Sequence, residues 1–173
     1  MIEMPPGQGF AAGTSIATAA GRRGVEHLAI GDEVLDAAGN PRRVHWVGRI
    51  VLAAAHLAAR PEAMPIRVCA GALGEGLPRR DLLVAPQTEL GVILPNGDVA
   101  TLPAQLLRNE TTILRATLPQ GVELFEVELA DGAGVLAEDL PAGLLLPNHA
   151  SASQRIATVR ARAWVSARAG CLP

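Results

Sequence analysis

Frequent chain breakers are the feature that most limits how this sequence can fold. The 173 residues include 13 prolines and 18 glycines, and these residues interrupt most windows before a long helix can form. Between them lie short runs rich in valine, isoleucine, leucine and threonine, which are typical of strands. The runs cover residues 14–18, 32–36, 42–53, 65–70, 81–85, 91–95, 98–102, 111–118, 122–129 and 134–138. The sequence therefore predicts one all-β domain.

Two of these regions allow a more detailed prediction. In "ELGVILPNGDVATL" the pair Asn96-Gly97 can take positive φ at both central positions of a tight turn, so the flanking runs should form a hairpin. In "VELFEVEL" apolar and glutamate residues alternate imperfectly. We expect a strand with one wet side and a bulge that shifts which face is buried.

Helix should be sparse. "LPAQLL" can form one or two turns, with Pro103 at the first helical position, where its missing N–H costs nothing. "AAAHLAAR" has high helix propensity, but Pro61 closes it within a few residues. A short helix and an extended continuation of the preceding strand remain equal alternatives there.

Composition excludes several classes of function. The net charge of −2 gives no overall attraction to nucleic acid or acidic lipid, although all 15 basic residues are arginine. His27, His45, His56 and His149 lack the spacing of a zinc site, so no metal or cofactor is expected. No run is apolar enough for a membrane span, and the start lacks a secretory signal. We expect a cytoplasmic protein with no nucleic-acid or membrane partner.

Residues 151–173 differ in character from the rest of the chain. They contain four arginines and no acidic residue, while Ile156, Val159, Ala163 and Trp164 fall near one helical face. A surface segment that packs Trp164 on the body is the simpler interpretation, and a tail that binds a polyanion is the alternative. Cys69 and Cys171 are expected as two separate thiols, with a single bridge as the alternative.

Three stretches together resemble the bacterial hedgehog/intein (Hint) domains. They begin at Gly9, Pro65 and Phe125 and contain the phrases "FAAGT", "IGDEVL", "AGALGEGLPRRDLL" and "LAEDLPAG", in the order and spacing of that family. The resemblance implies a compact, horseshoe-like β fold with two pseudo-symmetric halves and a central cleft. It also implies autoprocessing chemistry, in which a first-position cysteine or serine attacks the preceding peptide bond. In a Ser/Thr-x-x-His element the histidine then protonates the leaving nitrogen, while the hydroxyl and nearby backbone N–H groups stabilise the oxyanion.

The positions that match this chemistry are changed in the present chain. Gly9 stands at the nucleophile position. Ala85 and Thr88 of "APQT" stand at the hydroxyl and histidine positions, and Gly132 lies near a later histidine position. Glycine offers no attacking atom, and a threonine hydroxyl does not titrate near neutrality. The resemblance therefore implies a degenerate active site.

Two other sets of residues could replace the missing nucleophile. Thr14 and Ser15 lie close to the lost nucleophile and are candidate hydroxyls for an N–O acyl shift, but they need a base, and the nearest histidine in sequence is His27. Cys69 with His56 or His45 is a second conceivable pair, although a cysteine in the alternating run "PIRVCA" is more simply a core residue.

Other polar residues have structural interpretations. Asp32 and Asp81 are expected to form turns or pair with arginine. The arginine pairs at 22–23, 42–43 and 79–80 adjoin glycine or proline and should mark solvated turns. They would form a partner surface only if the fold brought two of these turns together.

The sequence thus predicts a leader at residues 1–8, a Hint-like domain at 9–150 and an arginine-rich extension at 151–173. The favoured function is a catalytically inactive module that serves a structural or interaction role for an unidentified protein or peptide partner. The cleft edge could hold that peptide by strand addition. The alternative is a residual autoproteolytic domain that uses Thr14 or Ser15. The oligomeric state is left open.

Overall fold

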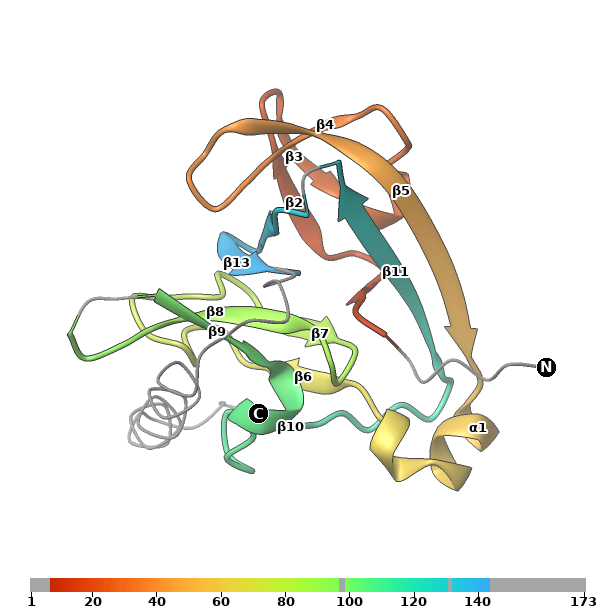
Figure 1. Cartoon of the computed structure of the whole chain (residues 1–173). Coiled ribbons are helices and arrows are strands. Elements are labelled where there is room, and N and C mark those ends of the chain that lie inside the picture. The colour runs from red at the N-terminus through yellow and green to blue at the C-terminus, as the bar shows by residue number, and fades with distance from the viewer. Residues whose placement is uncertain (1–6, 97–98, 131, 144–173) are drawn as a thin grey trace.

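The computed structural model describes residues 7–96, 99–130 and 132–143. Within these ranges the chain forms a single curled sheet of 13 strands and one short α-helix (Figure 1). The expected all-β architecture is confirmed. The leader up to residue 6 and the extension at 151–173 lie outside the described residues.

The strands are short except for two. Their bounds are β1 Phe10–Ala11, β2 Ser15–Thr18, β3 Gly21–Gly24, β4 Glu33–Leu35, β5 Pro41–Leu52, β6 Ile66–Val68, β7 Leu82–Val84, β8 Glu89–Ile93, β9 Val99–Pro103, β10 Ile113–Arg115, β11 Val122–Leu129, β12 Val135–Ala137 and β13 Leu140–Ala142. Helix α1 spans Ala54–Ala59, and 3-10 turns occupy Val25–His27 (η1), Pro61–Ala63 (η2) and Ala104–Leu107 (η3).

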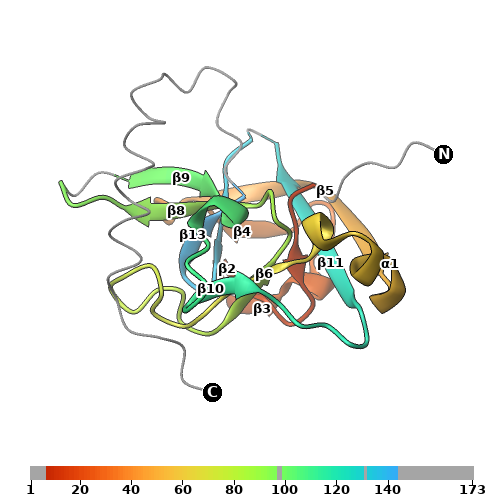
Figure 2. The ribbon, with the colours of Figure 1, turned by 90° about the horizontal axis from the view of Figure 1, so that it is seen from below.

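All the strand pairs are antiparallel, in the order β10-β6-β7-β1-β11-β5-β4-β2-β12-β13-β8-β9, with β3 attached to β2. The long ribbon of β5 and β11 joins the two halves of the sheet (Figures 1 and 2). The order departs strongly from chain order, so distant segments become neighbours. Strand β1, near the start of the chain, lies between β7 and β11.

Two apolar clusters fill the fold. The larger one includes Phe10, Ile16, Val84 and Phe125 inside the curl of the sheet. The smaller one lies under helix α1, where Leu57 packs with Ala11, Leu52, Ala85 and Leu124. Neighbouring residues of one strand therefore reach different clusters, because successive side chains point to opposite faces.

The predicted hairpin is confirmed, but the register of its strands centres the connection on Asn96 rather than on the Asn96-Gly97 pair. Strands β8 and β9 pair from Glu89 opposite Pro103 to Ile93 opposite Val99, and Gly97 itself lies outside the described residues. The register does shift between Glu128 and Leu129, but the bulge is not in "VELFEVEL": Glu128 pairs with Trp46 and Leu129 with Val44, so the extra residue is His45 of the partner strand β5. The expected wet side is limited to part of β11, because Leu124 and Phe125 are both buried.

The two helical predictions have different outcomes. "AAAHLAAR" forms α1 rather than extended strand, and Leu57 is buried beneath it. "LPAQLL" forms only the 3-10 turn η3, with Pro103 capping it after closing β9. Pro103 thus precedes the first helical position instead of occupying it.

Gly121 should be among the least replaceable residues of the fold. Its φ is +80°, and a Cβ there would lie 2.3 Å from the Leu52 carbonyl oxygen. We expect Gly121→Ala to lower the free energy of unfolding by at least about 2 kcal/mol, because backbone strain and a steric clash add. Urea denaturation measures this change. Gly39→Ala is the matched control, since Gly39 has the same φ of +80° and no atom within 4 Å; equal losses would refute the role of the clash.

Candidate functional site

Strand β1 carries residue 9 into the middle of the sheet. Phe10 pairs with Val84 of β7 on one side and with Phe125 of β11 on the other. Gly9, the residue before it, is buried. The Gln8–Gly9 peptide bond therefore lies directly before a strand that has a neighbouring strand on each side.

The side chain of Thr88 closes onto the backbone of Gly9. The Gly9 N–H donates to Thr88 Oγ1 at 2.9 Å, and the Thr88 hydroxyl donates to the Gly9 carbonyl at 3.1 Å. The Ala85 N–H donates to the same carbonyl at 2.9 Å. The fold thus brings together Gly9, Ala85 and Thr88, three of the four positions singled out in the sequence.

The turn after β7 fixes Thr88 in this place. Its N–H donates to the Ala85 carbonyl at 3.0 Å, and its own carbonyl accepts the Ala104 N–H from η3 at 2.9 Å. Thr88 is fully buried, and Ala85 is buried beside it. Backbone bonds on both sides therefore leave the Thr88 side chain little freedom to turn elsewhere.

This arrangement holds a peptide group without supplying reactive groups. A hydroxyl has one proton, and here that proton is directed to the Gly9 carbonyl. The Thr88 oxygen accepts the Gly9 N–H, so it has no proton to give to that nitrogen. Neither an attacking atom at residue 9 nor a group that titrates near neutral pH forms part of these contacts.

Gly132 lies elsewhere in the fold. Its φ is +70°, and its N–H donates to the Leu129 carbonyl in the turn that follows β11. Leu129 lies four residues beyond Phe125, the partner of Phe10, which is about 13 Å along an extended strand. The structure therefore does not bring Gly132 to the contacts around Gly9.

The candidate hydroxyls Thr14 and Ser15 belong to the next turn and to β2. Thr14 is buried, and its carbonyl accepts the Val25 N–H at 2.9 Å. Ser15 bonds through its backbone with Glu138, donating to Oε1 at 2.8 Å and accepting the Glu138 N–H at 2.8 Å. Within the described ranges neither hydroxyl makes a hydrogen bond, and the His27 side chain is mostly exposed.

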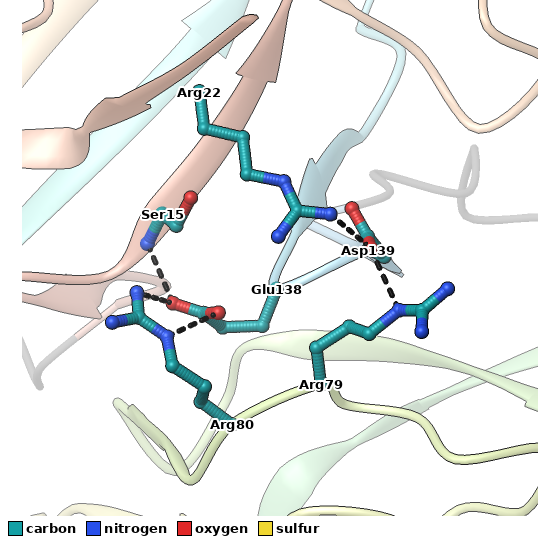
Figure 3. A network of polar contacts seen from close by, with 6 residues as sticks. All are labelled: Ser15, Arg22, Arg79, Arg80, Glu138 and Asp139. Atoms are coloured by element: carbon teal, nitrogen blue, oxygen red, sulfur yellow. Dashed lines mark hydrogen bonds and ion pairs between the residues drawn. The ribbon is translucent and has the colours of Figure 1, made fainter.

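Glu138 and Asp139 form the centre of a polar network that joins four segments (Figure 3). Glu138 is buried and accepts two hydrogen bonds from Arg80, at 2.8 and 3.0 Å, besides that from Ser15. Asp139 accepts from Arg22 at 2.5 Å and from Arg79 at 3.0 Å. The network ties β2, β3 and the segment before β7 to the β12–β13 turn.

That turn has an unusual backbone for its sequence. Glu138 and Asp139 have φ of 49° and 65° and connect Ala137 to its partner Leu140. Positive φ at both central residues is the geometry of a type I′ hairpin turn, which favours asparagine and glycine. The carboxylate contacts therefore stabilise a conformation that glutamate rarely adopts.

Comparison with known proteins decides the family. A family described as Hint domain matches residues 8–149. The chain belongs to the Hint domain family. The search of curated proteins found no match.

Solved intein structures share the fold of this Hint domain. The chain is similar to the DnaB intein from Synechocystis sp. PCC 6803, with a TM-score of 0.54 and 11% identity over 80% of this chain and 99% of that chain. The MchDnaB-1 intein has a TM-score of 0.53 and 17% identity over 77% and 98%. The gp41-1 intein has a TM-score of 0.51 and 12% identity over 78% and 96%. At these identities the likeness shows the fold alone.

Sequence reasoning missed Glu126 as a site residue of this Hint domain. A Cβ on Gly7 would lie 3.8 Å from both Glu126 carboxylate oxygens, so this acid borders the chain that leads into the Gln8–Gly9 bond. Desolvation, and then the charge of Glu128, raise the pKa of Glu126. The glutamate alternation in "VELFEVEL" was the available signal, but alone it indicated only a solvated face.

The arginine pairs are more than solvated turns. The predicted turns are wrong for two of the pairs, because Arg22-Arg23 lies in β3 and Arg42-Arg43 in β5. Arg22 and Arg79 meet at Asp139, and Arg80 pairs with Glu138. Asp32 accepts Arg23 at 2.8 Å and the Ala29 N–H at 2.9 Å, and these bonds lower its pKa. Asp81 pairs with Arg67 and accepts the Ala70 N–H. The expected structural roles of Asp32 and Asp81 are confirmed.

The remaining candidates stay apart from residue 9. Cys69 is buried in the main core and is not a free thiol, which corrects the expectation of a separate thiol; Cys171 lies outside the described residues. Over residues 7–96, 99–130 and 132–143 no cluster of three or more His, Cys, Asp or Glu side chains could bind a metal. In the same ranges no helix is long and apolar enough to cross a membrane.

Replacing Thr88 by valine tests its contact with Gly9. Valine keeps the shape of threonine but removes both hydroxyl hydrogen bonds. The Gly9 N–H then loses its acceptor, and the Gly9 carbonyl keeps only the bond from the Ala85 N–H. We expect the free energy of unfolding to fall by about 1–3 kcal/mol, as measured by urea denaturation. Thr88→Ser is the control and should retain most of the stability. A Thr88→Val protein as stable as the original would contradict the hydrogen-bond assignment.

Replacing Glu138 by alanine tests the polar network. The variant leaves the Ser15 N–H and Arg80 without their acceptor, and we expect a loss of about 2 kcal/mol in unfolding free energy. Glu110→Ala removes an exposed carboxylate that pairs with Arg108 and should cost under about 1 kcal/mol. Thermal or urea unfolding of both proteins compares the two. Similar losses of unfolding free energy in the two variants would mean that the buried contacts of Glu138 contribute no more to stability than an exposed salt bridge.

Proposed function

We propose that this Hint domain no longer breaks its own chain and serves as a structural or interaction module. The observation that carries the proposal is the pair of hydrogen bonds between the Thr88 hydroxyl and Gly9. The residues at positions 9, 85 and 88 hold a peptide unit in a buried sheet. They provide no thiol for attack and no imidazole for protonation of the leaving nitrogen.

The partner of such a module is proposed to be a protein or an extended peptide. Strand β1 already has neighbours on both sides, so a peptide cannot add to the sheet at that place. The ends of the strand order at β9 and β10, and the branch strand β3, offer edges for strand addition. A cytoplasmic location, without nucleic-acid or membrane partners, stays a prediction.

Steric room at residue 9 makes the loss of chemistry testable. A Cβ at Gly9 would lie 3.3 Å from the Phe125 carbonyl oxygen and 3.6 Å from Leu124 Cβ, so a small shift would admit a side chain. The surroundings of residue 9 therefore leave room for a nucleophilic side chain. In Gly9→Cys the backbone N–H of residue 9 would still be bonded to the Thr88 hydroxyl rather than to a titratable group.

Intact mass spectrometry after long incubation with a thiol or hydroxylamine tests the proposal. We expect the original chain to keep its full mass of 17.9 kDa. Gly9→Cys should also stay whole because Thr88 cannot protonate the leaving nitrogen, and Gly9→Ala is its control of equal backbone geometry. Circular dichroism verifies that each variant folds.

The masses distinguish the alternatives. Release of residues 1–13 or 1–14 would locate cleavage before Thr14 or Ser15, and its loss in Thr14→Ala or Ser15→Ala would establish a residual N–O acyl shift. Either result would overturn the inactive assignment. Release of residues 1–8 from Gly9→Cys but not from Gly9→Ala would show that the remaining frame still catalyses the first step.

A further inference from the structure

Three arginines from two distant segments converge on the β12–β13 turn. Arg22 extends from β3, and Arg79 and Arg80 lie in the segment before β7. Their guanidinium groups surround the two carboxylates of the turn (Figure 3). We call these three residues the arginine cluster. The fold thus brings together two of the arginine pairs, as a partner surface requires.

The ion pairs of the arginine cluster are buried unequally. The Glu138 side chain is 2% exposed and the Asp139 side chain 25%, whereas the three arginine side chains are between 54% and 65% exposed. In the surface pair Arg108–Glu110 the order is reversed, with the arginine more buried than its carboxylate. The cluster therefore presents its positive charges to solvent and keeps its negative charges beneath them. Three cations against two anions also leave an excess of one positive charge.

Much of the hydrogen-bonding capacity of the cluster is unused. A guanidinium group has five N–H donors. Arg22 donates to Asp139 Oδ2 through Nη2, and Arg79 donates to the same oxygen through Nε. Within residues 7–96, 99–130 and 132–143 neither side chain makes a further hydrogen bond. Both Nη groups of Arg79 are therefore open to an acceptor, and this pair is the fork that binds a carboxylate through two bonds.

The polar network orders these donors in advance. Asp139 holds one nitrogen each of Arg22 and Arg79, and buried Glu138 accepts two bonds from Arg80. The backbone is fixed as well, since the Arg79 N–H donates to the Glu138 carbonyl at 2.9 Å. Side chains that are already ordered lose less rotamer freedom when they bind a partner. The cluster is thus pre-organised for an anionic group.

A surface of this kind fits the carboxylates of a protein better than the phosphates of nucleic acid. Residues 1–150 hold 11 arginines and 17 acidic residues, a net charge of −6, which repels a long polyanion. Surfaces that bind nucleic acid neutralise several phosphates along the strand, and an excess of one positive charge does not provide for that. An acidic segment of a protein requires only local charge complementarity.

We propose that the arginine cluster binds an acidic segment of a partner protein. Carboxylates of that segment accept hydrogen bonds from the free N–H groups of Arg22 and Arg79, on the solvent side of Asp139. The inference rests on the proposed role as an interaction module and names the chemistry of the partner. It adds a side-chain contact to the available strand edges, one of which, β3, carries Arg22 itself.

Fluorescence anisotropy of labelled peptides tests the proposal on the full-length chain. The probe is a fluorescein-labelled hexaglutamate peptide, and labelled hexaglutamine is the neutral reference. We expect only hexaglutamate to bind, with an affinity that falls as the NaCl concentration rises. Arg22→Gln with Arg79→Gln should weaken binding about fivefold or more, because two exposed ion pairs are lost. Arg80 is kept in this variant, since its removal would leave Glu138 buried without a cation.

Arg49→Gln with Arg115→Gln is the matched control, because it removes the same charge from two exposed arginines outside the cluster. It should change the affinity less than about twofold, since distant exposed charges are screened. Arg22→Lys with Arg79→Lys keeps the charge and should bind hexaglutamate more tightly than the glutamine variant. Circular dichroism verifies that each protein folds, and the lysine variant provides the test if the glutamine variant does not.

Absence of hexaglutamate binding, or equal weakening in the control, would refute the proposal. Tighter binding of an oligothymidylate of matched charge to the same arginines would assign the cluster to phosphates and would also refute it. Intact masses of the same samples separate this inference from the proposed function. A chain that stays whole but does not bind contradicts only the acidic partner, whereas a chain that releases its first residues and still binds contradicts only the loss of cleavage.

Discussion

The pairing of β1 on both of its edges is the constraint on which the rest of this structure depends. Phe10 bonds to Val84 and Phe125 at once, so a strand of two residues joins β10-β6-β7 to the β11–β5 ribbon. Its two side chains also enter different cores, Phe10 the main cluster and Ala11 the one beneath α1. The start of the Hint domain is therefore needed for the fold independently of any reaction at its peptide bond.

This double role of β1 does not require a thiol or an imidazole at positions 9, 85 and 88, where the chain has glycine, alanine and threonine. The contact from Ala85 to Gly9 runs from backbone to backbone, so it does not depend on the side chain at either position. Only at residue 88 does a side chain take part, and the Thr88 hydroxyl satisfies both polar groups of Gly9. Buried polar groups must be hydrogen-bonded, and threonine meets that need without a titratable group.

Features set by neighbouring residues were predictable from the sequence, and features set by distant residues were not. The β8–β9 hairpin was predictable because the turn signal at Asn96-Gly97 is local. The imperfect alternation of β11 was misread as a bulge in that strand, because Leu124 and Phe125 are both buried in different clusters and the extra residue of the register shift is His45 of β5. The contact of Thr88 with Gly9 spans 79 positions and could be predicted only through the family resemblance. Glu126 was missed because its meaning comes from Gly7 and from its place opposite Gly48, which alternation alone does not reveal.

The phrases that carry the resemblance also supply the residues of the polar network around the β12–β13 turn. "AGALGEGLPRRDLL" supplies Arg79, Arg80 and Asp81, and "LAEDLPAG" supplies Glu138 and Asp139. In the structure these phrases bind each other through a buried carboxylate, and Asp139 also receives Arg22 from β3. A turn with two positive φ values at non-glycine residues requires such contacts to hold it. The phrases that carry the resemblance are thus also the ones that hold the β12–β13 turn against the segment before β7.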